Sequence, residues 1–285
     1  MILFNKLSIL ITCLFIACTS NALVVLELNT EFLWDDVEPH EGRVVGSQSY
    51  PAPTKAQYSS ELKYFKGVIE KSEADLVGLV EIENCKIAKD LAETLGRPWK
   101  PACLKGRDSY TGQDVAILTK LQIVKNTMND HSRYYGPRMS TGSKKGVRPS
   151  KVLSVLLEDS KGESYLVTNA HLVSRRGDND LKRLYQATAI TRAVIDFKLK
   201  LKPDHLIVMG DFNTYPNKPA INELKTVGVV NHAGRGVCSY TYKNTCSLID
   251  HVLVSKSMGK GRITSIELDK RYSDHKAVLF TPLHN

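Results

Sequence analysis

The stretch Leu206-Ile-Val-Met-Gly-Asp-Phe-Asn213 indicates most directly how this chain folds. Its four successive apolar residues are typical of a strand covered on both faces, because a strand with one solvated face alternates apolar and polar residues. Gly210, Asp211 and Asn213 then follow at the carboxyl end, the edge at which α/β sheets place binding sites. We therefore expect a buried strand over residues 206–209 that delivers Asp211 and Asn213 to a site.

Similar apolar runs predict further strands along the chain, and helical patterns lie between some of them. The strands are expected at residues 23–28, 76–80, 115–118, 152–157, 165–168, 248–254 and 277–280, and the helices at 56–70, 87–95 and 180–199. In the last helix, the side chains expected to face inward are Leu184, Ala187, Ile190, Ile195 and Leu199. Because helices separate only some of the strands, the pattern predicts an α/β (α+β) fold with mixed sheets and helices packed outside.

The composition and the amino terminus predict one exported domain. The 285 residues are 42% hydrophobic and 24% charged, which excludes a disordered, collagen-like or multi-pass membrane chain. Residues 1–22 hold one charge, Lys6, then an apolar run and the small residues Ser20 and Ala22, as in a secretory signal. That run is shorter than the ~20 residues of a spanning helix. We expect a signal peptide at 1–22, one domain at 23–285 without stable membrane insertion, and a secreted or periplasmic location; a lipid anchor at Cys18 is the less favoured alternative.

Charge and cysteine content fit that location. Without residues 1–22 the chain has 38 basic and 30 acidic residues, because only Lys6 is lost, and the net charge of +8 suits a polyanionic partner. Four cysteines are left, an even number that indicates two disulfides in an exported protein. Of the three pairings, Cys85–Cys103 with Cys238–Cys246 is favoured because each bond closes a short loop. Metal ligation is the alternative, but the spacing contains no CxxC or CxxH pair.

Polar residues at strand ends supply a consistent set of chemical groups. They are Asn29, Glu81, Glu83, Asn84, Asn169, His171, Asp211, Asn213, Asp250, Asp274 and His275. Each is weak evidence alone, since an Asp-x-Asn after a strand is usually a turn. Together they provide carboxylates for a hard cation, histidines that act as bases beside a carboxylate, and amides that hold phosphoryl oxygens. Hydrolysis of a phosphodiester needs these groups.

The order of these motifs, from Asn29 to Ser273-Asp274-His275, resembles the endonuclease/exonuclease/phosphatase superfamily, and deoxyribonuclease I within it. The resemblance covers nearly all of 23–285 and implies a single catalytic domain, a four-layer sandwich of two mixed β-sheets face to face with helices outside. It implies a site for Mg²⁺, with Mn²⁺ or Ca²⁺ as alternatives, at Asn29, Glu81 and Asp274. It also implies catalytic roles for the remaining matched residues: Asp211 and Asn213 orient the nucleophile, Asp250 and His275 activate water, and His171 assists the leaving group. Arg107, Arg148 and Asn169 are expected to contact substrate.

Three positions fit that family less well. Val80 stands where a Gln often precedes the metal-binding Glu, and the sequence offers His171 no evident carboxylate partner. Glu83 competes with Glu81 for the metal, because residues two apart in a strand point to the same face.

The expected substrate is nucleic acid. Residues 131–151 contain six basic residues and no carboxylate, with Tyr134 and Tyr135 placed to line a sugar–phosphate path. We expect a monomeric, Mg²⁺-dependent endonuclease without sequence specificity that acts on DNA in preference to RNA. The alternatives are a phosphodiesterase or phosphatase of the same fold acting on a lipid or small phosphoester, and a non-catalytic polyanion-binding protein.

Overall fold

The computed structural model describes residues 23–37, 44–45, 48–49, 51–107, 113–140 and 145–283, which contain sixteen strands, four α-helices and one short 3-10 helix (Lys256–Met258). The helices are α1 (Lys55–Lys71), α2 (Cys85–Leu95), α3 (Asp180–Leu201) and α4 (Pro219–Lys225). The strands are β1 (Val25–Leu33), β2 (Val44–Val45), β3 (Gln48–Ser49), β4 (Leu76–Ile82), β5 (Lys100–Cys103), β6 (Asp114–Thr119), β7 (Gln122–Ile123), β8 (Lys151–Glu158), β9 (Ser164–His171), β10 (His205–Asp211), β11 (Val229–Asn231), β12 (Tyr240–Tyr242), β13 (Thr245–Ser247), β14 (Asp250–Ser255), β15 (Gly261–Ile266) and β16 (Ala277–Pro282). The expected signal peptide and Cys18 lie outside the described residues.

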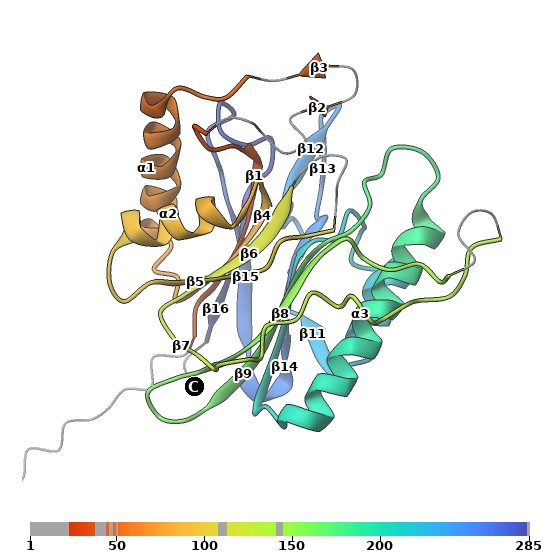
Figure 1. The fold of residues 1–285 in the computed structure, drawn as a ribbon. Helices are drawn as coiled ribbons and strands as arrows, with labels where there is room; N and C mark the ends of the chain where they lie inside the picture. Colours follow the sequence, from red (N-terminus) through yellow and green to blue (C-terminus); the bar gives the residue numbers. More distant parts are fainter. Residues whose placement is uncertain are drawn as a thin grey trace, which may run out of the picture.

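The elements form four layers (Figure 1). One sheet has the strand order β15-β16-β1-β4-β6-β5, and it faces a second sheet of order β11-β14-β10-β9-β8-β7. Helices α1 and α2 cover the outer face of the first sheet, and α3 and α4 cover that of the second. Both sheets are mixed, as the sequence predicts, because β1 runs parallel to β4 and β9 parallel to β10 while the other pairs are antiparallel.

Burial explains the apolar runs. Side chains from the facing sheets, such as Val25, Val167 and Ile207, form a central core, and the opposite faces of the same strands pack against helices. The strands that contribute to both cores are therefore covered on both faces, which is why their sequences do not alternate between apolar and polar residues. Each large apolar side chain buried in this way contributes about 1.5–3 kcal/mol.

The prediction of which α3 side chains face inward is wrong for the second half of the helix. Ala187 and Ile190 are buried, but Ile195 is 41% and Leu199 71% exposed. A helix repeats every 3.6 residues, so a step of five from Ile190 to Ile195 leaves the buried face. Val194 takes that place instead, and Phe197 and Leu201 pack partly buried beyond it.

Both favoured disulfides are present. Cys85 at the first turn of α2 is bonded to Cys103 in the edge strand β5, and Cys238 is bonded to Cys246 across the β12–β13 hairpin. Among the described residues, no helix has both the length and the apolar character needed to cross a bilayer.

Candidate active site

The carboxyl ends of the two parallel strand pairs meet at one end of the sandwich, where a cavity of about 1100 Å³ opens. Its lining residues include Glu81 at the end of β4, His171 at the end of β9 and Asp211 at the end of β10. Asp274 and His275 reach it from the loop before β16, and Tyr240 and Tyr242 from the β12–β13 hairpin. Residues that are far apart in sequence thus lie together at one end of the sandwich.

A bulge in β4 separates Glu81 from Glu83. The pairing of β4 with β6 shifts register between Val80 and Ile82, and Glu81 there has a φ of 63°. The hydroxyl of Thr30 donates to the carbonyls of Val80 and Glu81 and supports this turn. Glu81 consequently lines the cavity, whereas the Glu83 carboxylate accepts the Asp35 amide at 2.9 Å. The parity argument, which gave both residues the same face, fails because of the bulge.

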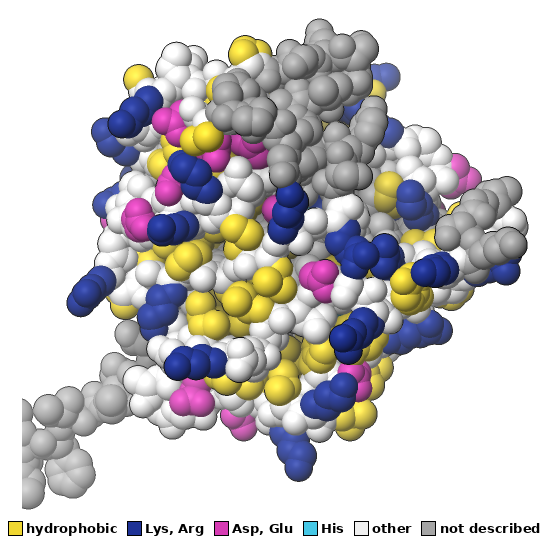
Figure 2. All heavy atoms as spheres, viewed as in Figure 1, with side chains coloured by type: hydrophobic (Ala, Val, Ile, Leu, Met, Phe, Trp, Pro, Cys, Tyr) yellow, Lys and Arg dark blue, Asp and Glu magenta, His cyan; other side chains and the backbone are white. Residues whose placement is uncertain are grey.

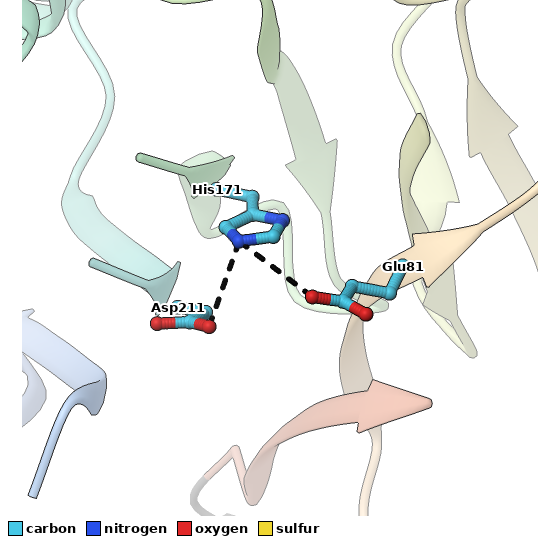
Figure 3. Close-up of side chains that lie close together, drawn as sticks. All are labelled: Glu81, His171 and Asp211. Carbon is cyan, nitrogen blue, oxygen red and sulfur yellow. Dashed lines mark ion pairs between the residues drawn. The ribbon is translucent and has the colours of Figure 1, made fainter. Parts of the chain in front are cut away.

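Glu81, His171 and Asp211 converge in the cavity (Figure 3). Nε2 of His171 lies 3.8 Å from Oε1 of Glu81 and 3.6 Å from Oδ2 of Asp211. The carboxylate neighbours of His171 that the sequence could not identify are therefore these two residues. Burial raises the pKa of both carboxyls; for Asp211 the charge of Asp250 adds to the rise, and for Glu81 the charge of Lys151 opposes it.

Asp250 and His275 form a hydrogen-bonded dyad. Nδ1 of His275 lies 2.8 Å from Oδ2 of Asp250, which is fully buried at the start of β14. Nε2, on the other side of the ring, lies 3.7 Å from Asp274 and 3.5 Å from the Asn29 amide. Burial disfavours the charged imidazole, but the adjacent Asp250 and then Asp211 outweigh it and raise the pKa of His275 to about 11.

Two amides orient Asp211. Nδ2 of Asn29 donates to Oδ2 of Asp211 at 3.2 Å, and the backbone amide of Asn213 donates to Oδ1 at 2.8 Å. The Asn213 side chain also lies 3.2 Å from Nε2 of His171. Gly210 allows this turn, because its φ is 135° and a Cβ there would lie 1.9 Å from the carbonyl oxygen of Ala170.

Two glutamates from β1 belong to the site although the sequence motifs assigned a role to neither. Glu31 lines the cavity, and burial followed by the charge of Asp274 raises its pKa to about 7. Glu27 is fully buried beneath the site, and neither of its carboxyl oxygens has a hydrogen-bond partner among the described residues. Burial, and then the charges of Asp250 and Asp211, raise its pKa well above the ordinary value. An acidic residue between Leu26 and Leu28 in an apolar run was the available signal.

The three residues expected to contact substrate have other partners in the structure. Asn169 points between the sheets, is fully buried and donates to the carbonyls of Leu79 and Ala116, because it lies two residues deeper in β9 than His171. Arg107 pairs with Asp130 at 3.8 Å, and Arg148 lies over the ring of Tyr135, 5.5 Å from its centroid. None of the three lines the cavity as described.

A different set of cations lines it. Lys151, at the start of β8, and Arg175, Arg176 and Lys182, which follow His171, border the same cavity as the carboxylates. We call these four residues the basic wall. The loop that carries two of them is fixed: Arg183 donates to the carbonyls of Val173 and Ser174, and the Asn179 amide donates to Ser174 and Arg176.

Comparison with known proteins identifies the family of this chain. The Endonuclease/Exonuclease/phosphatase family matches residues 31–275. The chain belongs to this family. Solved structures with the same fold include a mannosyl-6-phosphatase of Bacteroides thetaiotaomicron (TM-score 0.62, 16% identity, 90% of this chain and 98% of that one) and the human Nocturnin catalytic domain (0.60, 14%, 90% and 92%). A truncated TDP2 of Caenorhabditis elegans is similar too (0.57, 15%, 90% and 96%). Among the curated proteins, none matches the sequence.

The donor set fits the divalent cation that this family uses. Ligand atoms of Glu81, His171 and Asp211 lie within 4.8 Å of one another, and those of Asp211, Asp250 and His275 form a second such group. The donors are mostly carboxylate oxygens, which hard cations prefer. Burial is the main cause of the raised pKa values of Glu81 and Asp211, and a bound cation would offset it by stabilising the ionised carboxylates.

Proposed function

We propose that the protein is a secreted, monomeric, Mg²⁺-dependent phosphodiesterase that hydrolyses nucleic acid, with DNA preferred to RNA and without sequence specificity. The observation that carries the proposal is one cavity that is lined both by carboxylates, those of Glu81, Asp211 and Asp274, and by the four cations of the basic wall. Such a cavity suits a polyanionic chain whose scissile phosphate lies at the carboxylates and whose flanking phosphates contact the basic wall.

Each site residue has a role in this proposal. Asn29, Glu81 and Asp274 would hold the cation, which when bound would neutralise phosphate charge and lower the pKa of the nearby His275. Asp250 keeps the proton on Nδ1 of His275, so that Nε2 accepts a proton from the attacking water. Asp211 orients that water, Asn213 holds a phosphoryl oxygen, and His171 faces the leaving group.

The direct test is hydrolysis by purified residues 23–285. We expect cleavage of plasmid DNA, linear DNA and, more slowly, RNA with Mg²⁺, and none with EDTA. His275→Ala serves as the matched inactive variant, with kcat about 10²–10⁴-fold lower and DNA binding retained. A protein that cleaves no polynucleotide with any divalent cation would refute the proposal.

The second candidate is a phosphatase or phosphodiesterase of the same fold that acts on a small or lipid phosphoester. The specific observation in its favour is the shared fold with the mannosyl-6-phosphatase, together with a cavity large enough for a small phosphoester. Mannose 6-phosphate and sphingomyelin therefore belong in the same assay. Turnover of either one without cleavage of DNA or RNA would favour the alternative.

A further inference from the structure

The β12–β13 hairpin lies at the upper end of the sandwich in Figure 1, and Tyr240 and Tyr242 of β12 line the cavity. Its two-residue turn, Lys243 and Asn244, has φ values of 46° and 62°, the left-handed conformation of the tightest hairpin turns. Cys246 in β13 is bonded to Cys238, just before β12. A two-stranded hairpin is only marginally stable alone, so this bond compensates for its small size.

The base of the hairpin is fixed to the catalytic dyad through Ser239, which is fully buried. Its hydroxyl oxygen accepts the backbone amides of Ile249 and Asp250, both at 3.0 Å. Its carbonyl accepts the amide of Lys276 at 2.6 Å, next to His275. The hairpin therefore has a defined position relative to both members of the dyad.

Two tyrosines on one face of the hairpin line the cavity. Tyr240 and Tyr242 are two residues apart in β12 and so share a face. The ring of Tyr240 lies 4.8 Å from that of His275, centroid to centroid. Tyr242 lies farther from the dyad, and its side chain is 60% exposed. A large exposed aromatic ring that borders a cavity is a surface on which a flat ligand can stack.

We propose that Tyr242 stacks on the nucleobase next to the scissile phosphate, which makes the hairpin a base-binding subsite. This inference rests on the proposed nuclease function and names how the site holds its substrate. Tyr240 lies next to His275, and Tyr242 is two residues farther along β12, a distance of about 6.6 Å. A nucleotide whose phosphate lies beside His275 therefore has its base near Tyr242. Stacking on a tyrosine is tolerant of sequence, because every base has a π-face. The subsite accordingly favours chains with exposed bases without selecting among them.

The tyrosines named from the sequence are engaged elsewhere. The Tyr134 hydroxyl donates to Asp196 of α3, and its ring packs edge-on against Phe197. Tyr135 lies against Arg148. Neither residue is among those that line the cavity, whereas Tyr240 and Tyr242 are. The tyrosines that border the cavity thus come from the hairpin, and Phe32 of β1 is a further aromatic residue that lines it.

The test compares two single-stranded hexamers with equal phosphates, a deoxyribonucleotide chain and a chain of abasic tetrahydrofuran units. For the unaltered protein with Mg²⁺ we expect kcat/KM about tenfold higher on the chain with bases. Tyr242→Ala should raise KM for the hexamer with bases about tenfold, which removes the difference between the two substrates. Its kcat/KM on the abasic hexamer should equal that of the unaltered protein. Tyr242→Phe should retain it, and so should Thr245→Ala, a change at the exposed residue directly across the hairpin from Tyr242.

The outcomes separate this inference from the proposed function. If Tyr242→Ala lowers kcat/KM equally on both hexamers, or on neither, Tyr242 does not stack on bases. Either result would overturn this inference and leave the proposed function standing. If the unaltered protein cleaves neither hexamer with Mg²⁺ or Mn²⁺, the proposed function fails and the base subsite fails with it.

Discussion

Glu27 is a buried carboxyl group next to three other titratable site residues, and this position makes stability depend on pH. Its pKa is raised chiefly by burial and then by the charges of Asp250 and Asp211. The folded protein therefore keeps this proton to a higher pH than the unfolded chain does. The resulting stabilisation is complete below the unfolded pKa and is lost as the pH rises through the folded pKa.

Replacing Glu27 by the neutral, equally large Gln should remove that loss. We expect Glu27→Gln to have the same free energy of unfolding as the unaltered protein near pH 4 and a higher one as the pH rises toward 8. Urea unfolding at several pH values, with EDTA present, measures the difference. Glu93→Gln, at an exposed position of α2, is the control and should show no such trend. A Glu27→Gln variant that is less stable at every pH would contradict this account.

Single residues also show how far sequence reasoning reached into the site. Asp211, Asp250 and His275 were predicted as site residues, and their side chains do lie close together. The prediction was possible because an apolar run shows where a buried strand begins and ends. The family motif favoured Glu81 over Glu83, but strand parity did not separate them, because a bulge that reverses parity depends on the partner strand. It also assigned Asn169 to the substrate, since depth along a strand is not visible in a motif.

At the scale of elements, regular and well-buried segments were predicted and small ones were not. The strands around 206–209 and 165–168 and helices α1 and α2 lie where the apolar pattern predicts them. The β12–β13 hairpin has no apolar pattern, since most of its residues are exposed, and turn and disulfide hold it in place. The element that brings Tyr240 and Tyr242 to the cavity was for this reason not predictable from periodicity.

The hairpin disulfide should matter for substrate binding as well as for stability. In the chain-entropy model a separation of 8 residues contributes about 2.5 kcal/mol. We expect the double change Cys238→Ser with Cys246→Ser to lower the free energy of unfolding by about that amount. The KM for a DNA hexamer should also rise several-fold, because Tyr242 is no longer held in place.

The other disulfide supplies the control for that experiment. Cys85–Cys103 joins α2 to β5, and neither residue lines the cavity. Cys85→Ser with Cys103→Ser should therefore cost similar stability without raising KM. Equal KM effects from both pairs would mean that the hairpin acts only through general stability.

At the scale of the whole molecule, the question is whether the substrate is bound by the overall net charge or by the particular cations that border the cavity. The full sequence has a net charge of +9, and Figure 2 shows Lys and Arg side chains spread over one face with fewer Asp and Glu among them. Spread charge of this kind attracts any polyanion. The basic wall differs, because its four cations border the same cavity as the carboxylates.

Salt dependence distinguishes the two. Each phosphate contact on a single strand contributes a slope of about −0.7 to the plot of log affinity against log salt. Arg176→Gln in the basic wall should make the slope for log kcat/KM on a single-stranded hexamer shallower by about 0.7. Lys89→Gln removes the same charge from the exposed surface of α2 and should leave the slope unchanged. If both variants change the slope equally, overall charge governs binding, and the wall has no particular role in holding the chain.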